Sequence, residues 1–214
     1  MELLAFARGP ALWASLAVLV AGSLWRIAGI LRLGAVADLS EPRSTRFFAG
    51  AMRGIFARMI PRREFRRRNK LGVWNGYVYH LGLAVIVFGY LPHIHFVERL
   101  TELAWSPLPD AVVYLSVGLT FVSLFIALME RLADPVRRLL SGFDDYFSWA
   151  VVLLPLATGM IAIQQSEPLP LAIHLLSVEL LFVWLPFGKL AHAFLVFASR
   201  GVTGAALARK GAPL

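Results

Sequence analysis

Residues 171–192 read LAIHLLSVELLFVWLPFGKLAH, an apolar stretch that carries two histidines and a glutamate. The stretch belongs to an apolar run over about 171–198, which is long enough to cross the ~30 Å hydrocarbon core of a bilayer as a helix. An ionisable side chain is costly inside a membrane span, so His174, Glu179 and His192 are candidates for a function rather than for packing. Whether that argument applies depends on the rest of the chain.

The rest of the chain is also strongly apolar. Hydrophobic residues make up 58% of the 214 residues, which is more than soluble domains usually carry. Apolar runs of near-spanning length recur along the sequence. The sequence therefore predicts an all-α, integral membrane bundle that forms a single membrane domain over residues 1–214, with five transmembrane helices at about 11–31, 72–91, 111–129, 147–163 and 171–198.

The positive charge is distributed unevenly between the connections. The net charge is +8, and arginine and lysine concentrate in 32–70, in 130–146 and in the C-terminal tail, whereas 92–110 and 164–170 contain only Arg99. Basic loops stay in the cytoplasm. The pattern predicts an outside N-terminus, a cytoplasmic C-terminus and a multi-pass protein of the bacterial cytoplasmic (inner) membrane. Since topology explains the charge, we expect no nucleic-acid partner.

The first basic loop, 32–71, contains STRFFAGAMRGIFARMI, in which large apolar residues recur at helical spacing with arginines between them. This pattern predicts a helix that lies in the headgroup region of the bilayer, where anionic lipid attracts the arginines. A docking face for a cytoplasmic partner is the alternative, and the two are compatible.

The chain has no cysteine. This excludes disulfides, a covalently attached c-type haem and a cysteine-ligated iron–sulfur cluster within the chain. Any redox centre here needs other ligands, and histidine is the obvious candidate.

The positions of the histidines suggest two pairs. His174 and His192 are 18 residues apart, which on one straight helix is five turns and about 27 Å. His80 matches the depth of His192 on an antiparallel span, and His93 and His95 lie at the outer end, where they can face His174. Two stacked b-type haems require such pairs of axial imidazoles. The alternatives are histidines that hydrogen-bond across a helix interface and, for His93 and His95, solvated histidines at a membrane edge.

Three segments resemble one known family. LPFGKLAH with a histidine 18 residues before its own, WNGYVYHLGLAVIVFGY and GSLWR resemble the fifth, second and first spans of the gamma subunit of respiratory nitrate reductases and its relatives. That family is a dihaem cytochrome b, which takes electrons from quinol near the outer surface and passes them to a cytoplasmic iron–sulfur subunit. The resemblance implies two haem b groups, with His80 and His192 as ligands of the inner haem and His174 as a ligand of the outer one.

The fourth ligand departs from the family pattern. In nitrate reductases a second histidine follows ten residues after the first, and here that position is Tyr90. The expected substitute is His93, with His95 as the alternative. On an unbroken helix His95 would point about 60° away from His80 and His93 about 220°, but Pro92 can kink the helix. The departure suggests a divergent branch, such as those that serve heterodisulfide-reductase-like iron–sulfur proteins.

Other positions have expected supporting roles. Arg26 and Lys189 are candidates for contacts with haem propionates, with snorkelling of the long side chain as the alternative for Arg26. Candidates that bind a quinone carbonyl or take its proton near the outer haem are Arg99, Glu102, Gln164 and Gln165. Glu179 is a candidate proton carrier or hydrogen-bonding partner of another helix.

The sequence thus predicts a dihaem subunit that transfers electrons between the quinone pool and a cytoplasmic iron–sulfur or catalytic subunit of a respiratory oxidoreductase. The alternative is a non-redox membrane anchor or assembly subunit of such a complex, with degenerate haem sites.

Overall fold

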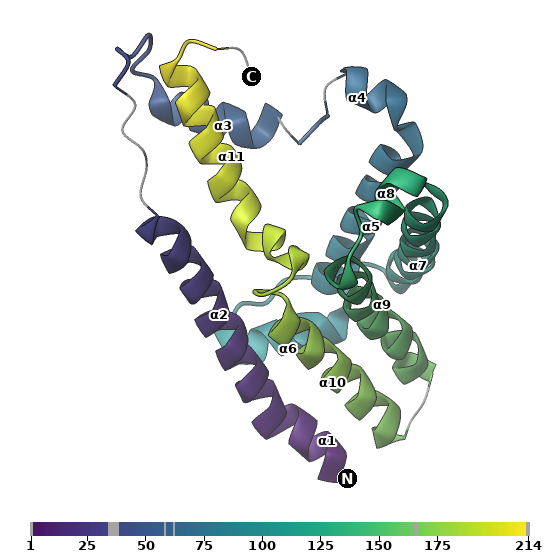
Figure 1. Cartoon of the computed structure of the whole chain (residues 1–214). Helices are drawn as coiled ribbons and strands as arrows, with labels where there is room; N and C mark the ends of the chain where they lie inside the picture. The colour runs from purple at the N-terminus through teal and green to yellow at the C-terminus, as the bar shows by residue number, and fades with distance from the viewer. Residues whose placement is uncertain (1, 34–38, 58, 62, 165–166, 213–214) are drawn as a thin grey trace. The chain divides into compact units, whose positions relative to one another are not determined.

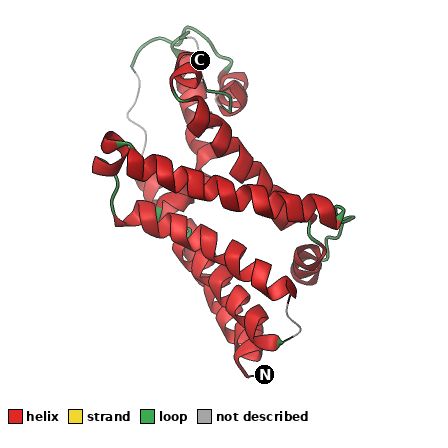
Figure 2. Cartoon of the chain, turned by 90° about the vertical axis from the view of Figure 1, so that its right-hand side faces the viewer, coloured by secondary structure: helices red, strands yellow, loops and turns green. Residues whose placement is uncertain are grey.

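The computed structural model describes residues 2–33, 39–57, 59–61, 63–164 and 167–212, and this part of the chain consists of helices and loops (Figures 1 and 2). The elements are α1 (Glu2–Phe6), the π-helical turn η1 (Ala7–Ala11), α2 (Leu12–Arg32), α3 (Phe47–Ala57), α4 (Arg63–Arg68), α5 (Lys70–Gly89), α6 (Leu91–Thr101), α7 (Asp110–Ala133), α8 (Pro135–Leu139), α9 (Phe143–Gln164), α10 (Pro168–Trp184), the 3₁₀ turn η2 (Lys189–Ala191) and α11 (His192–Arg209).

Within the described ranges, five helical segments are long and apolar enough to cross a membrane: Glu2–Arg32, Lys70–Gly89, Asp110–Ala133, Phe143–Ile163 and Lys189–Arg209. The predicted all-α class with five such helices is therefore confirmed. The first four segments overlap the predicted spans. The direction in which the chain crosses the membrane stays a prediction.

The fifth predicted span, 171–198, is wrong as a single helix. α10 ends at Trp184, and α11 begins only at His192. Pro186 has no amide hydrogen and disfavours a helical conformation in the residue before it, while the amides of Phe187 and Gly188 turn back to the carbonyl of Trp184 at 3.0 and 3.1 Å. The five-turn relation between His174 and His192 therefore does not hold.

The chain divides into two compact units. The first unit comprises residues 1–12 and 69–181, and the second comprises residues 13–68 and 182–214.

The core of the first unit lies between α5, α7 and α9. Ile86, Val117, Leu124 and Leu156 are buried together there. A polar pair crosses the same interface, since the Asn75 side chain donates to the Ser123 carbonyl at 2.9 Å and the Ser123 hydroxyl donates to the Asn75 side-chain oxygen at 2.6 Å. These contacts fix the register of α5 against α7.

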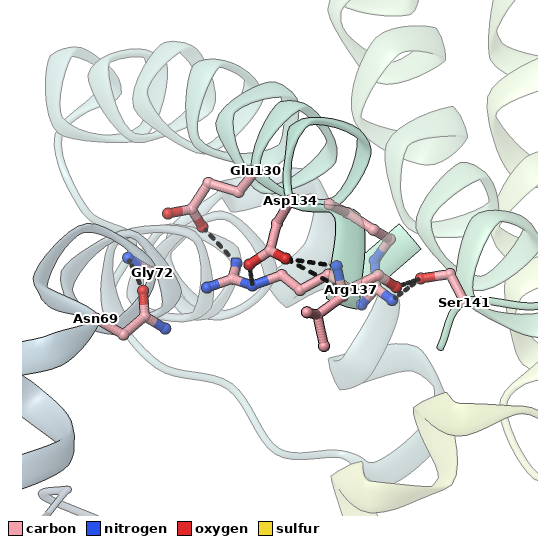
Figure 3. Close-up of polar contacts among 8 residues, drawn as sticks. Asn69, Gly72, Glu130, Asp134, Arg137 and Ser141 are labelled. Carbon is pink, nitrogen blue, oxygen red and sulfur yellow. Dashed lines mark hydrogen bonds and ion pairs between the residues drawn. The ribbon is translucent and has the colours of Figure 1, made fainter. Parts of the chain in front are cut away.

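The loop between α7 and α9 is ordered by ion pairs (Figure 3). The Arg137 guanidinium lies 3.2 Å from the Glu130 carboxylate and 3.4 Å from that of Asp134. Asp134 also caps α8, because its side chain accepts the amides of Val136 and Arg137. Arg131 pairs at 2.8 Å with the carboxylate of Asp145, whose side chain is buried.

The second unit pairs α3 with α11. Gly50 and Gly54 of α3 are buried, as is Gly204 of α11. Glycine permits this close approach because a side chain at any of the three would collide with the facing helix.

Candidate functional site

The site begins where α5 ends. Tyr90 is extended (φ −83°, ψ 125°) between α5 and α6, so no unbroken helix joins His80 to His93 and the angles expected for one do not apply. α6 restarts with Pro92 in its first turn, where the missing amide hydrogen costs no helical bond. Ile94 of α6 is 2% exposed and anchors the helix. The new direction of α6 decides where its histidines lie.

His93 lies against His174 within the first unit. Their ring centroids are 6.3 Å apart and the ring planes are 23° from parallel. Two metal–nitrogen bonds of about 2 Å each, with half a ring on either side, would place the centres of two axial imidazoles roughly 6 Å apart. The separation is therefore of the size that a shared metal between the two rings requires.

α9 also contacts the His174 ring. The Thr158 hydroxyl oxygen lies 3.3 Å from Nδ1 of His174 and 2.9 Å from the Ser177 hydroxyl. Gly159 leaves space for the ring, since a Cβ there would lie 3.1 Å from Cε1 of His174. Sequence reasoning missed both residues, although a glycine inside an apolar span was a visible signal.

His95 faces a different environment. Its side chain is 57% exposed and its Nδ1 lies 3.0 Å from the Glu98 carboxylate one turn later on α6. The structure thus brings His93, and not His95, together with His174.

Three of the histidines share one hydrogen-bonding pattern. Nδ1 lies 2.7 Å from the Gly76 carbonyl in His80, 2.9 Å from the Ile86 carbonyl in His93 and 2.8 Å from the Lys189 carbonyl in His192. A carbonyl only accepts, so in a neutral imidazole the proton is on Nδ1 and the lone pair is on Nε2. Metal-ligating histidines commonly have this second contact, which fixes the tautomer and the ring.

Two further groups at the α5–α6 junction bear on the choice of ligand. Burial lowers the pKa of the His93 imidazole, and the hydrogen bond to Ile86 opposes that shift only in part, so the neutral ligand form is favoured. Burial also raises the pKa of the Tyr90 phenol, which disfavours a phenolate ligand at neutral pH. The Tyr90 ring instead packs edge-on against His93 at a centroid distance of 5.3 Å.

His80 belongs to the first unit and His192 to the second. His80 packs on the Tyr79 ring at a centroid distance of 4.3 Å, and His192 is the first residue of α11. Their pairing as inner-haem ligands stays a prediction.

Arg26 has a local role that the sequence did not reveal. Within the second unit its guanidinium donates to the carbonyls of Pro186 at 3.1 Å and Phe187 at 3.0 Å. Those carbonyls lie in the break after α10, so Arg26 satisfies backbone groups that a continuous helix would have paired. Lys189 begins the 3₁₀ turn before His192. Contacts of Arg26 and Lys189 with a propionate stay predictions.

The four residues expected to bind quinone lie at or just after the ends of α6 and α9, the helices that also carry His93 and Thr158. Arg99 and Glu102 are exposed at the end of α6, where Arg99 donates to the His95 carbonyl at 3.2 Å and Glu102 ends the helix with φ 63°. Gln164 is the last residue of α9, and its side chain and all of Gln165 lie outside the described residues. Their quinone role stays a prediction.

Glu179 of α10 is 6% exposed, and neither carboxylate oxygen has a hydrogen-bond partner among the described residues. The expected role of Glu179 as a proton carrier or as a hydrogen-bonding partner of another helix stays a prediction.

Comparison with known proteins adds one relative. A curated sequence from Nitratidesulfovibrio vulgaris strain Hildenborough, described only as a protein, is 29% identical over 209 residues, which cover 94% of this chain and 91% of the relative. No protein-family model matches the sequence, and no solved structure matches it.

Proposed function

We propose that the chain is a membrane dihaem cytochrome b subunit, which transfers electrons between the quinone pool and a cytoplasmic iron–sulfur or catalytic subunit of a respiratory oxidoreductase. The observation that carries the proposal is the contact between His93 and His174, two histidines that are 81 positions apart in the sequence and whose rings lie nearly parallel at 6.3 Å. The resemblance of three segments to the nitrate reductase gamma subunit supports the same function.

The side chains present fit haem b, because a neutral imidazole nitrogen binds haem iron. His93 and His174 would hold the outer haem, with Nδ1 of His93 on a backbone carbonyl and Gly159 leaving room beside the His174 ring. His80 and His192 would hold the inner haem, each with Nδ1 on a backbone carbonyl and the lone pair of the neutral ring on Nε2. A bound haem supplies reversible one-electron chemistry, and the protein supplies the ligands, their orientation and an apolar surround.

The remaining parts of the proposed function concern partners and location. Because the chain has no cysteine, an iron–sulfur cluster has to be on another subunit. Arg99, Glu102, Gln164 and Gln165 are the proposed contacts for quinone near the outer haem. The protein is proposed to reside in the bacterial cytoplasmic (inner) membrane.

The test is the haem content of the full chain purified from membranes together with its partners. Pyridine haemochrome analysis should give two haem b per chain. His80→Ala and His192→Ala should each remove the same haem and leave the other, as judged by the low-temperature absorption bands. A chain without haem in an intact complex would instead support the anchor function, and two mutants that lose different haems would refute the inner pairing.

A further inference from the structure

α3 is attached to one particular part of α11. Gly54 approaches so closely that a Cβ there would lie 2.7 Å from the Gly204 Cα and 2.5 Å from the Arg200 carbonyl oxygen, whereas Gly50 lies opposite Ala208 and Gly204. The pairing of Gly50 with Ala208 and of Gly54 with Arg200 shows that the two helices run in opposite directions. The glycine face of α3 is therefore fully used by residues 200–208.

This contact sets the level of α3 relative to the membrane span. The segment Lys189–Arg209 is the fifth candidate span, and residues 200–208 lie in its C-terminal half. α3 has 11 residues, or about 16 Å, and is too short to cross a bilayer. α3 consequently lies beside the end of a span, where hydrocarbon gives way to headgroups.

The opposite face of α3 is apolar and largely exposed among the described residues of the second unit. Phe48, Met52 and Phe56 follow at intervals of four and share one face, and position 48 is about 200° from Gly50 around the helix. Phe48 is 78% exposed and Phe56 is 65% exposed. At the level of the acyl boundary, such a face gains free energy by entering lipid.

Positive charge flanks this face. Arg46, just before α3, and Arg53, on α3, are both exposed. The segment before them is tied to the end of α11, because the Arg43 amide donates to the Arg209 carbonyl at 2.9 Å and the Arg209 guanidinium donates to the Ser40 carbonyl at 2.6 Å. Residues 40–57 contain three arginines and one acidic residue, Glu41.

We propose that α3 and the segment 40–46 form a binding surface for anionic phospholipid, with Phe48, Met52 and Phe56 among the acyl chains and Arg43, Arg46 and Arg53 at the headgroup phosphates. Lipid is favoured over an acidic protein because the arginines flank bare aromatic side chains at the end of a span, where basic residues are attracted to an anionic leaflet. The proposal does not depend on haem.

The absence of cysteine allows a direct test on the full chain. Phe48→Cys, Phe56→Cys and, as a control in the basic segment, Glu41→Cys are each labelled with a nitroxide and reconstituted in phosphatidylglycerol-containing nanodiscs. Power-saturation EPR should give an oxygen-to-nickel accessibility ratio above one at positions 48 and 56 and below one at position 41. Ratios below one at all three positions would place the face in water and would indicate a protein-docking surface, which overturns the proposal.

A second pair of measurements tests the headgroup chemistry. Nanodiscs of phosphatidylcholine alone, or the change Arg46→Gln with Arg53→Gln in the anionic nanodiscs, should lower the ratios at positions 48 and 56. Unchanged ratios in both would overturn the anionic part of the proposal. The two substituted arginines are not part of the Gly50–Gly204 contact, and an unchanged far-ultraviolet circular dichroism spectrum verifies the fold. None of these measurements depends on whether the chain holds haem.

Discussion

A single backbone conformation determines which histidine reaches His174. Tyr90 is extended and ends α5, and α6 starts one residue later in a new direction. His93 then lies over the last turns of α5, with Nδ1 on the Ile86 carbonyl, while His95 points to Glu98. Periodicity from His80 favoured His95 because it assumed one continuous helix.

The two histidines make a direct comparison possible. His93→Ala should remove the outer haem, so that one of the two b-type signals is lost, because no other histidine lies against His174 among the described residues. His95→Ala should leave both haems, since it removes only an exposed contact with Glu98, and exposed contacts of this kind contribute less than about 1 kcal/mol. Low-temperature absorption and the EPR of the low-spin ferric form measure this. Loss of a haem in the His95 variant with an intact His93 variant would reverse the assignment.

Gly159 provides a second test of the same site. Gly159→Leu should displace the His174 ring, because even a Cβ there would lie 3.1 Å from Cε1, and overpacking typically costs about 1–3 kcal/mol. We expect loss of the outer haem or a shift of its midpoint potential, with the inner haem unchanged. Gly118→Leu on α7 is the matched control, since nothing lies within 4 Å of a Cβ at that position. Equal effects of the two changes would mean that Gly159 has no special relation to the site.

At the scale of the elements, the break between α10 and α11 depends on Arg26. Arg26→Ala removes two hydrogen bonds from a charged donor to the carbonyls of Pro186 and Phe187. The group is only half-buried, so we expect a destabilisation of about 1–2 kcal/mol, seen as a lower Tm. Arg32→Ala, at the exposed end of the same helix, is the control. A shifted haem potential with an unchanged Tm would instead support a propionate contact.

The break also shows what a sequence reveals about elements. Hydropathy located the first four spans because a run of apolar residues is a local property. The mean hydropathy stays high across residues 185–188, because leucine, proline and phenylalanine keep the run apolar although the proline ends the helix. The Pro186–Phe187–Gly188 signal was present but was interpreted as part of one span. The contact of Arg26 with Pro186, 160 residues away, has no local signal at all.

Predictability differed in the same way within the site. From the sequence, His80, His93, His174 and His192 were predicted as haem ligands, and that role stays a prediction. The choice between His93 and His95 needed the fold, because it depends on the angle between α5 and α6. Thr158 and Gly159 come from a third helix, and only the packing shows that they lie against the His174 ring.

At the scale of the whole molecule, the two basic loops differ in how much charge they present. Segment 130–146 contains three arginines but also four carboxylates, and Arg131 and Arg137 are paired with them. Acidic residues contribute little to the positive-inside rule, so the predicted topology is unaffected. The loop offers little net charge to an acidic partner, however, and α4 with Arg66, Arg67 and Arg68 is the stronger candidate for docking.

We therefore expect charge reversal in α4 to separate electron transfer within the chain from electron transfer to the partner. The triple variant carries glutamate at Arg66, Arg67 and Arg68. It should reduce the iron–sulfur partner more slowly with quinol, and the rate should lose most of its dependence on salt, because complementary charge mainly accelerates encounter. Haem content and the rate of haem reduction should stay as in the unchanged protein.

Arg138→Glu in α8 is the control for a single reversal in the other loop, and protease protection of the loops shows whether the triple variant inserts correctly. A correctly inserted triple variant with the normal rate and salt dependence would show that α4 is not part of the docking site, and misinsertion would show that these arginines act on topology.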